Sequence, residues 1–242
     1  MHDGTMQTQL STCLAGCLAL ALWLARPAGA AAAGVSPESL ERLAPQWQDG
    51  DLIFIRISNP IFRRVAETTD SWETHVGLLF SETNGTWQVA ESTFPFSKFS
   101  SLNRFIARSE HRRFCVMRYR GGLTPEEKLD LRLSAGLRMG IPYDLGFNYD
   151  SPGLYCSKFV RQAYREATGY EVGRLETFRE LLAKNPRAPL GFWRVWFLGH
   201  IPWERRCVTT TSQLKSGDLT LVFDSTQSSA PMGRRDASRP GR

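Results

Sequence analysis

Histidine and cysteine are scarce in this chain of 242 residues, which has four histidines and five cysteines. No two cysteines form a C-x-x-C pair, and their wide spacing argues against a structural zinc site. There is no internal repeat and no strong bias toward glycine or proline, which excludes collagen-like sequence, wholesale disorder and a small disulfide-rich scaffold. The remaining composition, 42% hydrophobic and 22% charged, is that of an ordinary globular protein with enough chain to bury a core.

An apolar run near the N-terminus predicts export. Leu10–Leu24 is followed by Arg26 and by the small-residue site Ala28–Ala31, as in a secretory signal peptide, although no Lys or Arg precedes the run. The run is short for a membrane span. We predict a signal peptide over residues 1–30, cleaved near Ala30, and a periplasmic location; an uncleaved N-terminal membrane anchor is the alternative.

The C-terminal residues 225–242 predict a disordered basic tail, because they contain almost no apolar side chains. Four arginines against one aspartate give this tail a charge of +3, half of the formal net charge of +6. The domain between the two ends, residues 31–224, keeps the other half. Its arginines are scattered and no recognition motif accompanies them, so we expect no nucleic-acid partner.

The body alternates strand-like and helix-like segments. Hairpin-linked strands among helices predict a single α+β domain. A row of leucines, Leu129, Leu133 and Leu137, recurs at helical spacing and predicts a helix after the capping box that Thr124 and Glu127 begin. We expect strands at 52–55, 75–80, 87–91, 114–117, 207–211 and 219–223, and helices near 36, 60–65, 102–106, 124–140, 156–168 and 176–184.

Three cysteines remain after removal of the signal segment: Cys115, Cys156 and Cys207. An odd number leaves at least one thiol free or paired outside the chain. Cys115 and Cys207 lie in or beside apolar strands and are interpreted as inert buried thiols. Cys156 follows the turn-rich segment 148–153 and begins an amphipathic helix. There the helix dipole and free N–H groups favour a thiolate and could hold an oxyanion, although packing in the first turn is the plainer interpretation.

A thiolate nucleophile needs a base and a group that orients the base. His2 leaves with the signal segment, His111 lies in a basic turn, and His200 lies in a loop that stays open as an alternative. His75 begins a strand, and Gly77 after it leaves room over the ring for a helix terminus.

Glu91 could orient His75 if the two side chains share a sheet face. A two-residue turn at Asn84-Gly85 would put them on opposite faces. A three-residue loop, Thr83–Gly85 with a left-handed glycine, instead sets Glu91 opposite Gly77 and diagonal to His75. The triad hypothesis therefore predicts the longer loop or a compensating bulge.

An ordered set of short motifs resembles the YiiX/YebB-like cysteine hydrolases, the circularly permuted branch of the NlpC-type papain-like superfamily. Each motif alone is weak, but the set spans about Gly50 to Phe223. The motifs are Gly50–Phe54, Thr74–Gly77, Glu91, Pro142–Asp144 and Tyr155–Val160.

The resemblance implies a permuted papain-like α+β fold, with an antiparallel sheet packed against helices. It implies that Cys156 is the nucleophile, His75 the base and Glu91 the residue that fixes the imidazole. Tyr143 and Tyr155 would line the substrate or oxyanion site, with a packing aromatic as the alternative for Tyr143.

One departure from the family concerns Lys158, which stands where an acidic residue is common in relatives. We expect its side chain to face outward, away from the chemistry.

These observations predict a cysteine amidase or peptidase of the cell envelope that needs no metal or organic cofactor. The alternatives are a lipid acyltransferase or phospholipase on the same scaffold, and a binding protein without turnover. A run of aromatic side chains could meet acyl chains and a membrane surface, or could pack as core or lid; these are Trp193, Trp196, Phe197 and Trp203. The substrate would be a small molecule, peptide or lipid of the envelope.

Overall fold

The computed structural model describes Leu40 and residues 46–226, all of which belong to one compact unit. The predicted signal peptide, the helix near Ser36 and all of the predicted tail except Ser225 and Thr226 lie outside the described residues. Within the described residues, no helix combines the length and apolar character needed to cross a membrane.

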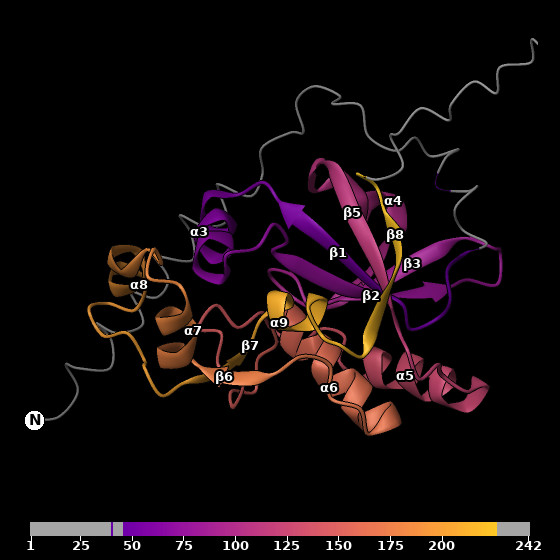
Figure 1. Ribbon diagram of the computed structural model, residues 1–242. Coiled ribbons are helices and arrows are strands. Elements are labelled where there is room, and N and C mark those ends of the chain that lie inside the picture. The colour runs from indigo at the N-terminus through magenta and orange to yellow at the C-terminus, as the bar shows by residue number, and fades with distance from the viewer. Residues whose placement is uncertain (1–39, 41–45, 227–242) are drawn as a thin grey trace, which may run out of the picture. The chain divides into compact units, whose positions relative to one another are not determined.

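A six-stranded antiparallel sheet forms the centre of this unit (Figure 1). Its strand order is β4-β3-β2-β1-β5-β8, and a second sheet pairs β6 with β7. The strands are β1 Leu52–Ile57, β2 His75–Ser81, β3 Trp87–Glu91, β4 Lys98–Ser101, β5 Ser109–Tyr119, β6 Leu175–Thr177, β7 Arg206–Val208 and β8 Leu219–Asp224. The predicted α+β class is confirmed.

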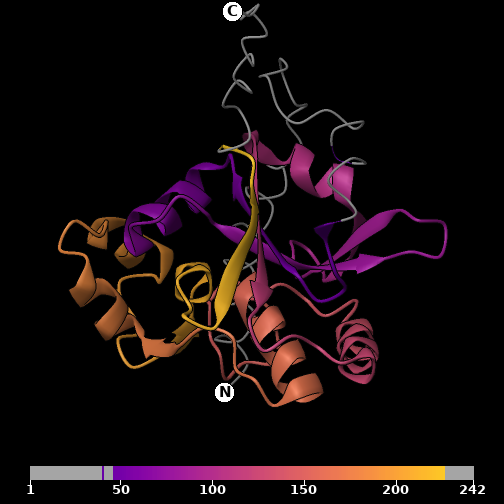
Figure 2. The same cartoon turned by 45° about the vertical axis from the view of Figure 1, so that its right-hand side comes forward.

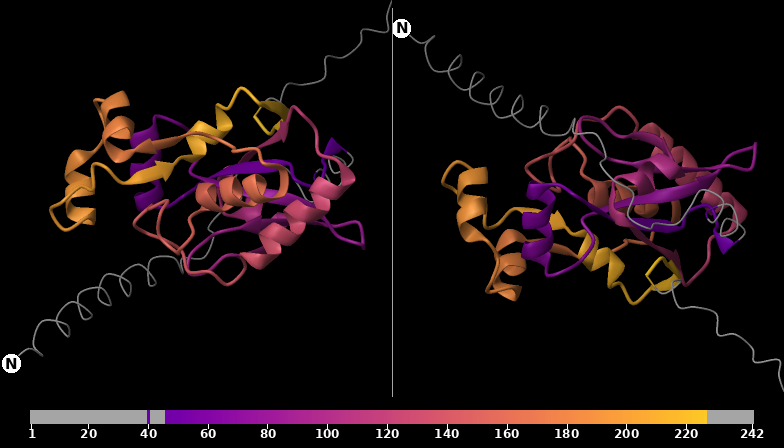
Figure 3. Two further views of the ribbon diagram at one scale, coloured as in Figure 1. Left: turned by 90° about the horizontal axis from the view of Figure 1, so that it is seen from below. Right: turned by 90° about the horizontal axis from the view of Figure 1, so that it is seen from above.

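Helices cover both faces of the large sheet, and a second group surrounds β6 and β7 (Figures 1 and 2). On one face lie α5 (Pro125–Leu137) and α6 (Cys156–Thr168), and on the other α4 (Leu102–Ala107). The second group is α3 (Pro60–Thr69), α7 (Phe178–Lys184), α8 (Leu190–Trp196) and α9 (Thr210–Leu214). Views from below and above show α8 and α5 toward opposite ends of this unit (Figure 3).

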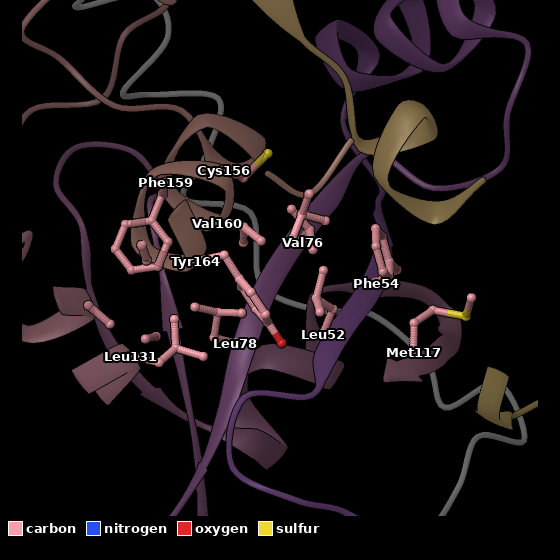
Figure 4. Close-up of a cluster of buried hydrophobic side chains, with 14 of the residues drawn as sticks. Leu52, Phe54, Val76, Leu78, Met117, Leu131, Cys156, Phe159, Val160 and Tyr164 are labelled. Carbon is pink, nitrogen blue, oxygen red and sulfur yellow. The ribbon is translucent and has the colours of Figure 1, made fainter. Parts of the chain in front are cut away.

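The strand alternation divides the core into two layers. Leu52 and Phe54 of β1 face α6, whereas Ile53 and Ile55 face α4, as the two-residue period of a strand requires. Figure 4 shows the α6 layer, with Cys156 at its margin where the helix begins. The fold therefore places the start of α6 against one end of the buried strands.

The predicted helix after Thr124 forms, and Thr124 and Glu127 make the capping box. The leucine row that indicated the helix does not form its buried face. Leu129, Leu133 and Leu137 are exposed, and α5 packs against α6 and the core through a different set, which includes Leu131 and Ala135.

Three other boundaries differ from the sequence prediction. Residues 176–177 belong to a strand, and the helix expected from there begins at Phe178. The strand expected over 207–211 ends at Val208, and α9 follows from Thr210. The aromatic stretch, for which no element was predicted, forms α8. Thr209 caps α9 by accepting a hydrogen bond from the Ser212 N–H, which explains why threonines typical of a strand begin a helix here.

Gly77 leaves room for a different partner from the one predicted. A Cβ at this position would lie 2.3 Å from Val89 Cγ1, 3.0 Å from Ala90 O and 3.3 Å from Phe105 Cε2. The space beside Gly77 is therefore filled by β3 and by Phe105 of α4, and not by the cysteine helix.

Gly77→Ala is expected to lower the free energy of unfolding by about 1–3 kcal/mol, because the added methyl group overpacks this contact. The matched control is Gly136→Ala in α5, where a Cβ meets nothing within 4 Å. That change is expected to raise stability by up to about 1 kcal/mol through helix propensity. Urea denaturation of both variants checks the two signs, and equal effects would contradict the packing argument.

Candidate active site

Cys156 is the first residue of α6, as predicted. The strand β7 fixes this helix start: the Ser157 hydroxyl donates to Val208 O at 2.7 Å, and the Val208 N–H donates to Tyr155 Oη at 3.0 Å. Tyr155 precedes the helix without a side-chain hydrogen bond that caps it. The first-turn N–H groups of α6 therefore have no capping side chain, which leaves the positive end of the helix dipole at Cys156.

His75 and Glu91 form a buried pair. His75 Nε2 lies 2.6 Å from Glu91 Oε2, and the two side chains are 1% and 0% exposed. Leu78 pairs with Ala90, a register that sets Glu91 opposite Gly77.

The hairpin loop has the predicted length. The Glu82 N–H donates to Thr86 O at 2.8 Å, and Gly85 has φ +81°, the left-handed conformation expected of a three-residue loop. The strand parity that the triad hypothesis requires is thus observed.

Two further residues hold Glu91, and the sequence analysis missed both. Arg108 Nη2 donates to Glu91 Oε1 and Oε2 at 2.7 Å each, and the Ser100 hydroxyl donates to Oε1 at 2.7 Å. Ser100 lies on β4 and Arg108 just after α4. The only sequence signal was the alternation on β4, because no motif precedes either residue.

The charges of this pair shift both pKa values in the direction that favours an imidazolium. Burial alone would raise the pKa of Glu91, but His75 and Arg108 outweigh it and lower that pKa to about 2. For His75, burial alone would lower the pKa. The hydrogen bonds and charges of Cys156 and Glu91 outweigh this effect, so the pKa of His75 is raised. His75 Nδ1 has no hydrogen-bond partner among the described residues, which leaves this nitrogen free to exchange a proton with the sulfur.

Tyr143 contributes a further hydroxyl close to Cys156. Its Oη is buried and has no hydrogen-bond partner among the described residues. Burial and the nearby charge of Cys156 raise the pKa of Tyr143 well above its ordinary value, so it stays a neutral donor. The Tyr143 hydroxyl and the N–H groups of α6 can therefore donate to an oxyanion that forms at Cys156.

The other cysteines and histidines are not part of this hydrogen-bonded group, although Cys207 lines the pocket beside Cys156. Cys115 and Cys207 are free and buried, so they do not pair with each other. Burial raises the pKa of both thiols, that of Cys207 to about 12, as expected for inert cysteines. His111 and His200 are exposed.

An apolar pocket opens beside Cys156, on the side of α3, α7 and α8. Tyr143 and Tyr155 line it, in the position that the resemblance implied. The remaining lining is mostly aromatic and aliphatic: Phe62, Val65, Phe147, Phe178, Leu181, Trp193 and Val208, with Thr68, Thr69, Thr74, Thr209, Thr210, Ser157 and Cys207. An apolar group joined to a carbonyl carbon could be held here.

Lys158 is buried, contrary to the expectation that it faces outward. Its side chain is 1% exposed, and Nζ donates to the carbonyl oxygens of Ser151 (2.5 Å), Gly153 (2.8 Å) and Asn148 (3.3 Å). Burial lowers the pKa of Lys158. The ammonium group thus donates hydrogen bonds to the carbonyl oxygens of the turn before the cysteine helix. A side chain that pointed to solvent could not make these contacts.

Asp144 stabilises the same turn by accepting hydrogen bonds from residues inside it. Its carboxylate accepts from Gly146 N at 2.8 Å, Asn148 N at 2.9 Å and the Ser151 hydroxyl at 2.6 Å. Together with Lys158 it stabilises the segment that carries Tyr143 at one end and Cys156 at the other.

Comparison with known proteins agrees with this geometry. Residues 46–223 match the model of the permuted papain-like amidase enzymes, the YaeF/YiiX, C92 family. The chain is similar to the uncharacterized protein YiiX of Escherichia coli (strain K12), with 28% identity over 184 residues that span 76% of this chain and 90% of the relative.

A solved structure is also similar, the crystal structure of metalloprotein yiiX from Escherichia coli O157:H7. The TM-score is 0.69 at 28% identity, over 74% of this chain and 98% of that one. Among the residues described for the present chain, no three His, Cys, Asp or Glu side chains gather so as to hold a metal ion.

Glu91→Gln is expected to slow alkylation of Cys156 by iodoacetamide at least about tenfold below pH 6.5. Loss of the carboxylate lowers the pKa of His75, so the imidazolium that stabilises the thiolate is lost at lower pH. The pH–rate profile of labelling measures this. Glu67→Gln is the control. It removes the carboxylate of an exposed ion pair with Arg64 and should leave the pH–rate profile unchanged. An unaltered profile in Glu91→Gln would show that Glu91 does not act through His75.

Lys158→Met is expected to lower the free energy of unfolding by about 1–3 kcal/mol, because buried carbonyl oxygens lose their donor. It should also open residues 148–153 to limited proteolysis. Lys98→Met removes an exposed ammonium group and should change neither quantity. If the two variants behave alike, the turn does not depend on Lys158.

Proposed function

The chain belongs to the permuted papain-like amidases of the YaeF/YiiX, C92 family, and from this premise we propose that it is a cysteine hydrolase that cleaves an amide bond of peptide type. The observation that carries the proposal is the buried His75–Glu91 pair beside a cysteine at a helix start. Cys156 is the nucleophile, His75 the general base and acid, and Glu91 the residue that orients and charges the imidazole.

Acylation begins with attack of the Cys156 thiolate on the carbonyl carbon of the substrate. The sulfur–carbon bond forms, and the carbonyl oxygen takes the electron pair as an oxyanion, which the Tyr143 hydroxyl and the α6 N–H groups can bind. His75 then gives its proton to the nitrogen of the leaving group. The carbon–nitrogen bond breaks, and the amine departs from the acyl-enzyme.

Deacylation reverses the roles of the same groups. His75, now neutral, takes a proton from water, and the hydroxide adds to the thioester carbon. The sulfur–carbon bond breaks, the carboxylic acid leaves, and Cys156 returns to a thiolate beside the imidazolium. Glu91 stays ionised when His75 is neutral, because the Arg108 guanidinium and the Ser100 hydroxyl still donate to its carboxylate.

A second candidate is cleavage of an ester in a lipid, as in a phospholipase or lipid acyltransferase. The apolar lining of the pocket favours it, because aromatic and aliphatic side chains can bind an acyl chain. The same nucleophile and base would serve, with an alkoxide in place of the amine. We also propose export to the periplasm, supported by the apolar run Leu10–Leu24 and the small-residue site after it.

Cys156→Ala is expected to lower turnover at least about a thousandfold, since it removes the nucleophile. Wild type, Cys156→Ala and Cys115→Ala are compared on cell-wall peptides and on phospholipids, with release of amine or fatty acid as the readout. Cys115→Ala deletes a thiol outside the pocket and should retain activity.

The substrate that responds to Cys156 identifies the bond class. Cysteine-dependent release of fatty acid alone would favour the lipid candidate. The absence of cysteine-dependent product on both panels would favour a binding protein without turnover and contradict the proposal.

A further inference from the structure

Helix α8 is attached to its neighbours through its tryptophans. Trp193 Nε1 donates to Thr68 Oγ1 of α3 at 2.8 Å, and Trp196 Nε1 donates to Leu145 O at 3.0 Å. The ring of Trp193 also stacks on Phe197, with centroids 5.8 Å apart. These contacts bury Trp193 and partly bury the other rings. The aromatic side chains of this stretch therefore pack and hydrogen-bond so as to hold α8 in place.

Several large apolar side chains of α8 and of the residues just after it make none of these contacts and are exposed to solvent. Val195 is 78% and Leu198 87% exposed, and Leu190 is also exposed. Leu198 has φ +52°, a conformation that costs a non-glycine residue energy. The backbone is therefore strained at the residue that presents the most exposed apolar side chain of this segment.

The charged side chains of this stretch of the chain have one sign. Residues 185–203 contain no Asp or Glu. Arg187 and Arg194 are exposed, and neither forms an ion pair with any residue that the structure describes. The α8 surface, defined by Arg187, Leu190, Arg194, Val195 and Leu198, is therefore apolar and cationic.

The exposed leucine row of α5 has different surroundings. Leu129, Leu133 and Leu137 lie on a helix that also carries Glu126, Glu127 and Asp130 beside Lys128 and Arg132. The two signs are mixed there, and α5 and α8 lie toward opposite ends of this unit in both views (Figure 3). The α5 row matches the α8 surface in exposed apolar area but lacks its uniform charge.

We propose that the α8 surface docks on a bilayer that contains anionic phospholipids. Val195, Leu198 and Leu190 would enter the boundary between headgroups and acyl chains, and Arg187 and Arg194 would pair with lipid phosphates. The uniform positive charge selects this occupant, because a second copy of the same surface would be repelled by its own arginines.

Docking of this surface has a consequence for the pocket. Trp193 of α8 lines the same pocket as Cys156, so docking of the α8 surface would bring this pocket close to the bilayer. A substrate held in the membrane could then enter the pocket without crossing water. This consequence rests on the proposed function, whereas docking itself does not.

Vesicle sedimentation tests the docking. The chain from Ala31 onward is used, because the apolar run Leu10–Leu24 would bind vesicles by itself and the described residues all belong to one compact unit. The wild type should bind vesicles of phosphatidylglycerol and phosphatidylcholine, and bind phosphatidylcholine alone much more weakly. Val195→Asp with Leu198→Asp should weaken binding at least about tenfold. Arg187→Gln and Arg194→Gln should each weaken it about fivefold.

The matched control places the same charges on the other apolar row. Leu133→Asp with Leu137→Asp on α5 should leave vesicle binding within about twofold of the wild type. The proposal is overturned if the wild type does not bind anionic vesicles, if the α5 variant loses as much binding as the α8 variant, or if the α8 variant instead abolishes a dimer. Because sedimentation needs no turnover, Cys156→Ala should bind as the wild type does, and an inactive enzyme would leave the docking result intact.

Discussion

The carboxylate of Glu91 is the charge around which the site is arranged. It is fully buried, and such a group is tolerated only where cations and hydroxyl donors surround it. Arg108 and Ser100 supply two sets of donors, and His75 supplies the third. Because the remaining carboxylate oxygen positions are taken by fixed donors, the imidazole has one orientation, with Nδ1 turned toward Cys156. A buried anion thus sets both the geometry and the charge of the base.

The nucleophile depends on a second constraint, the turn of residues 142–154. Asp144 satisfies N–H groups inside this turn, and Lys158 of the cysteine helix satisfies its carbonyls. Helix and turn are therefore one unit, and the Tyr143 hydroxyl keeps its place relative to the sulfur. An apolar pocket that Cys156 and Tyr143 both line lies beside the sulfur, and His75 is not among its lining residues.

Local signals predicted much of this from the sequence. The turn-rich segment 148–153 and the amphipathic pattern after it gave the start of α6, and strand parity gave the hairpin loop on which the His75–Glu91 contact depends. The failures have a common cause. Arg108 follows α4 without a motif, and Lys158 reads as a surface residue of an amphipathic helix, because their partners lie far along the chain or in an irregular turn. The leucine row of α5 indicated the helix correctly, but periodicity does not reveal which face of a helix finds a partner.

Titration of the His75 ring by NMR tests the central claim, that a buried carboxylate and a cysteine thiolate hold the imidazole as a cation. Spectra of the protein with His111 and His200 replaced by glutamine would report the one remaining histidine of the chain from Ala31 onward. The account predicts a pKa above the ordinary value near 6.5 that falls when Cys156 is changed to serine, because the serine hydroxyl carries no charge. A ring that is neutral below pH 6 in the wild type, or a pKa that the serine variant leaves unchanged, would contradict it.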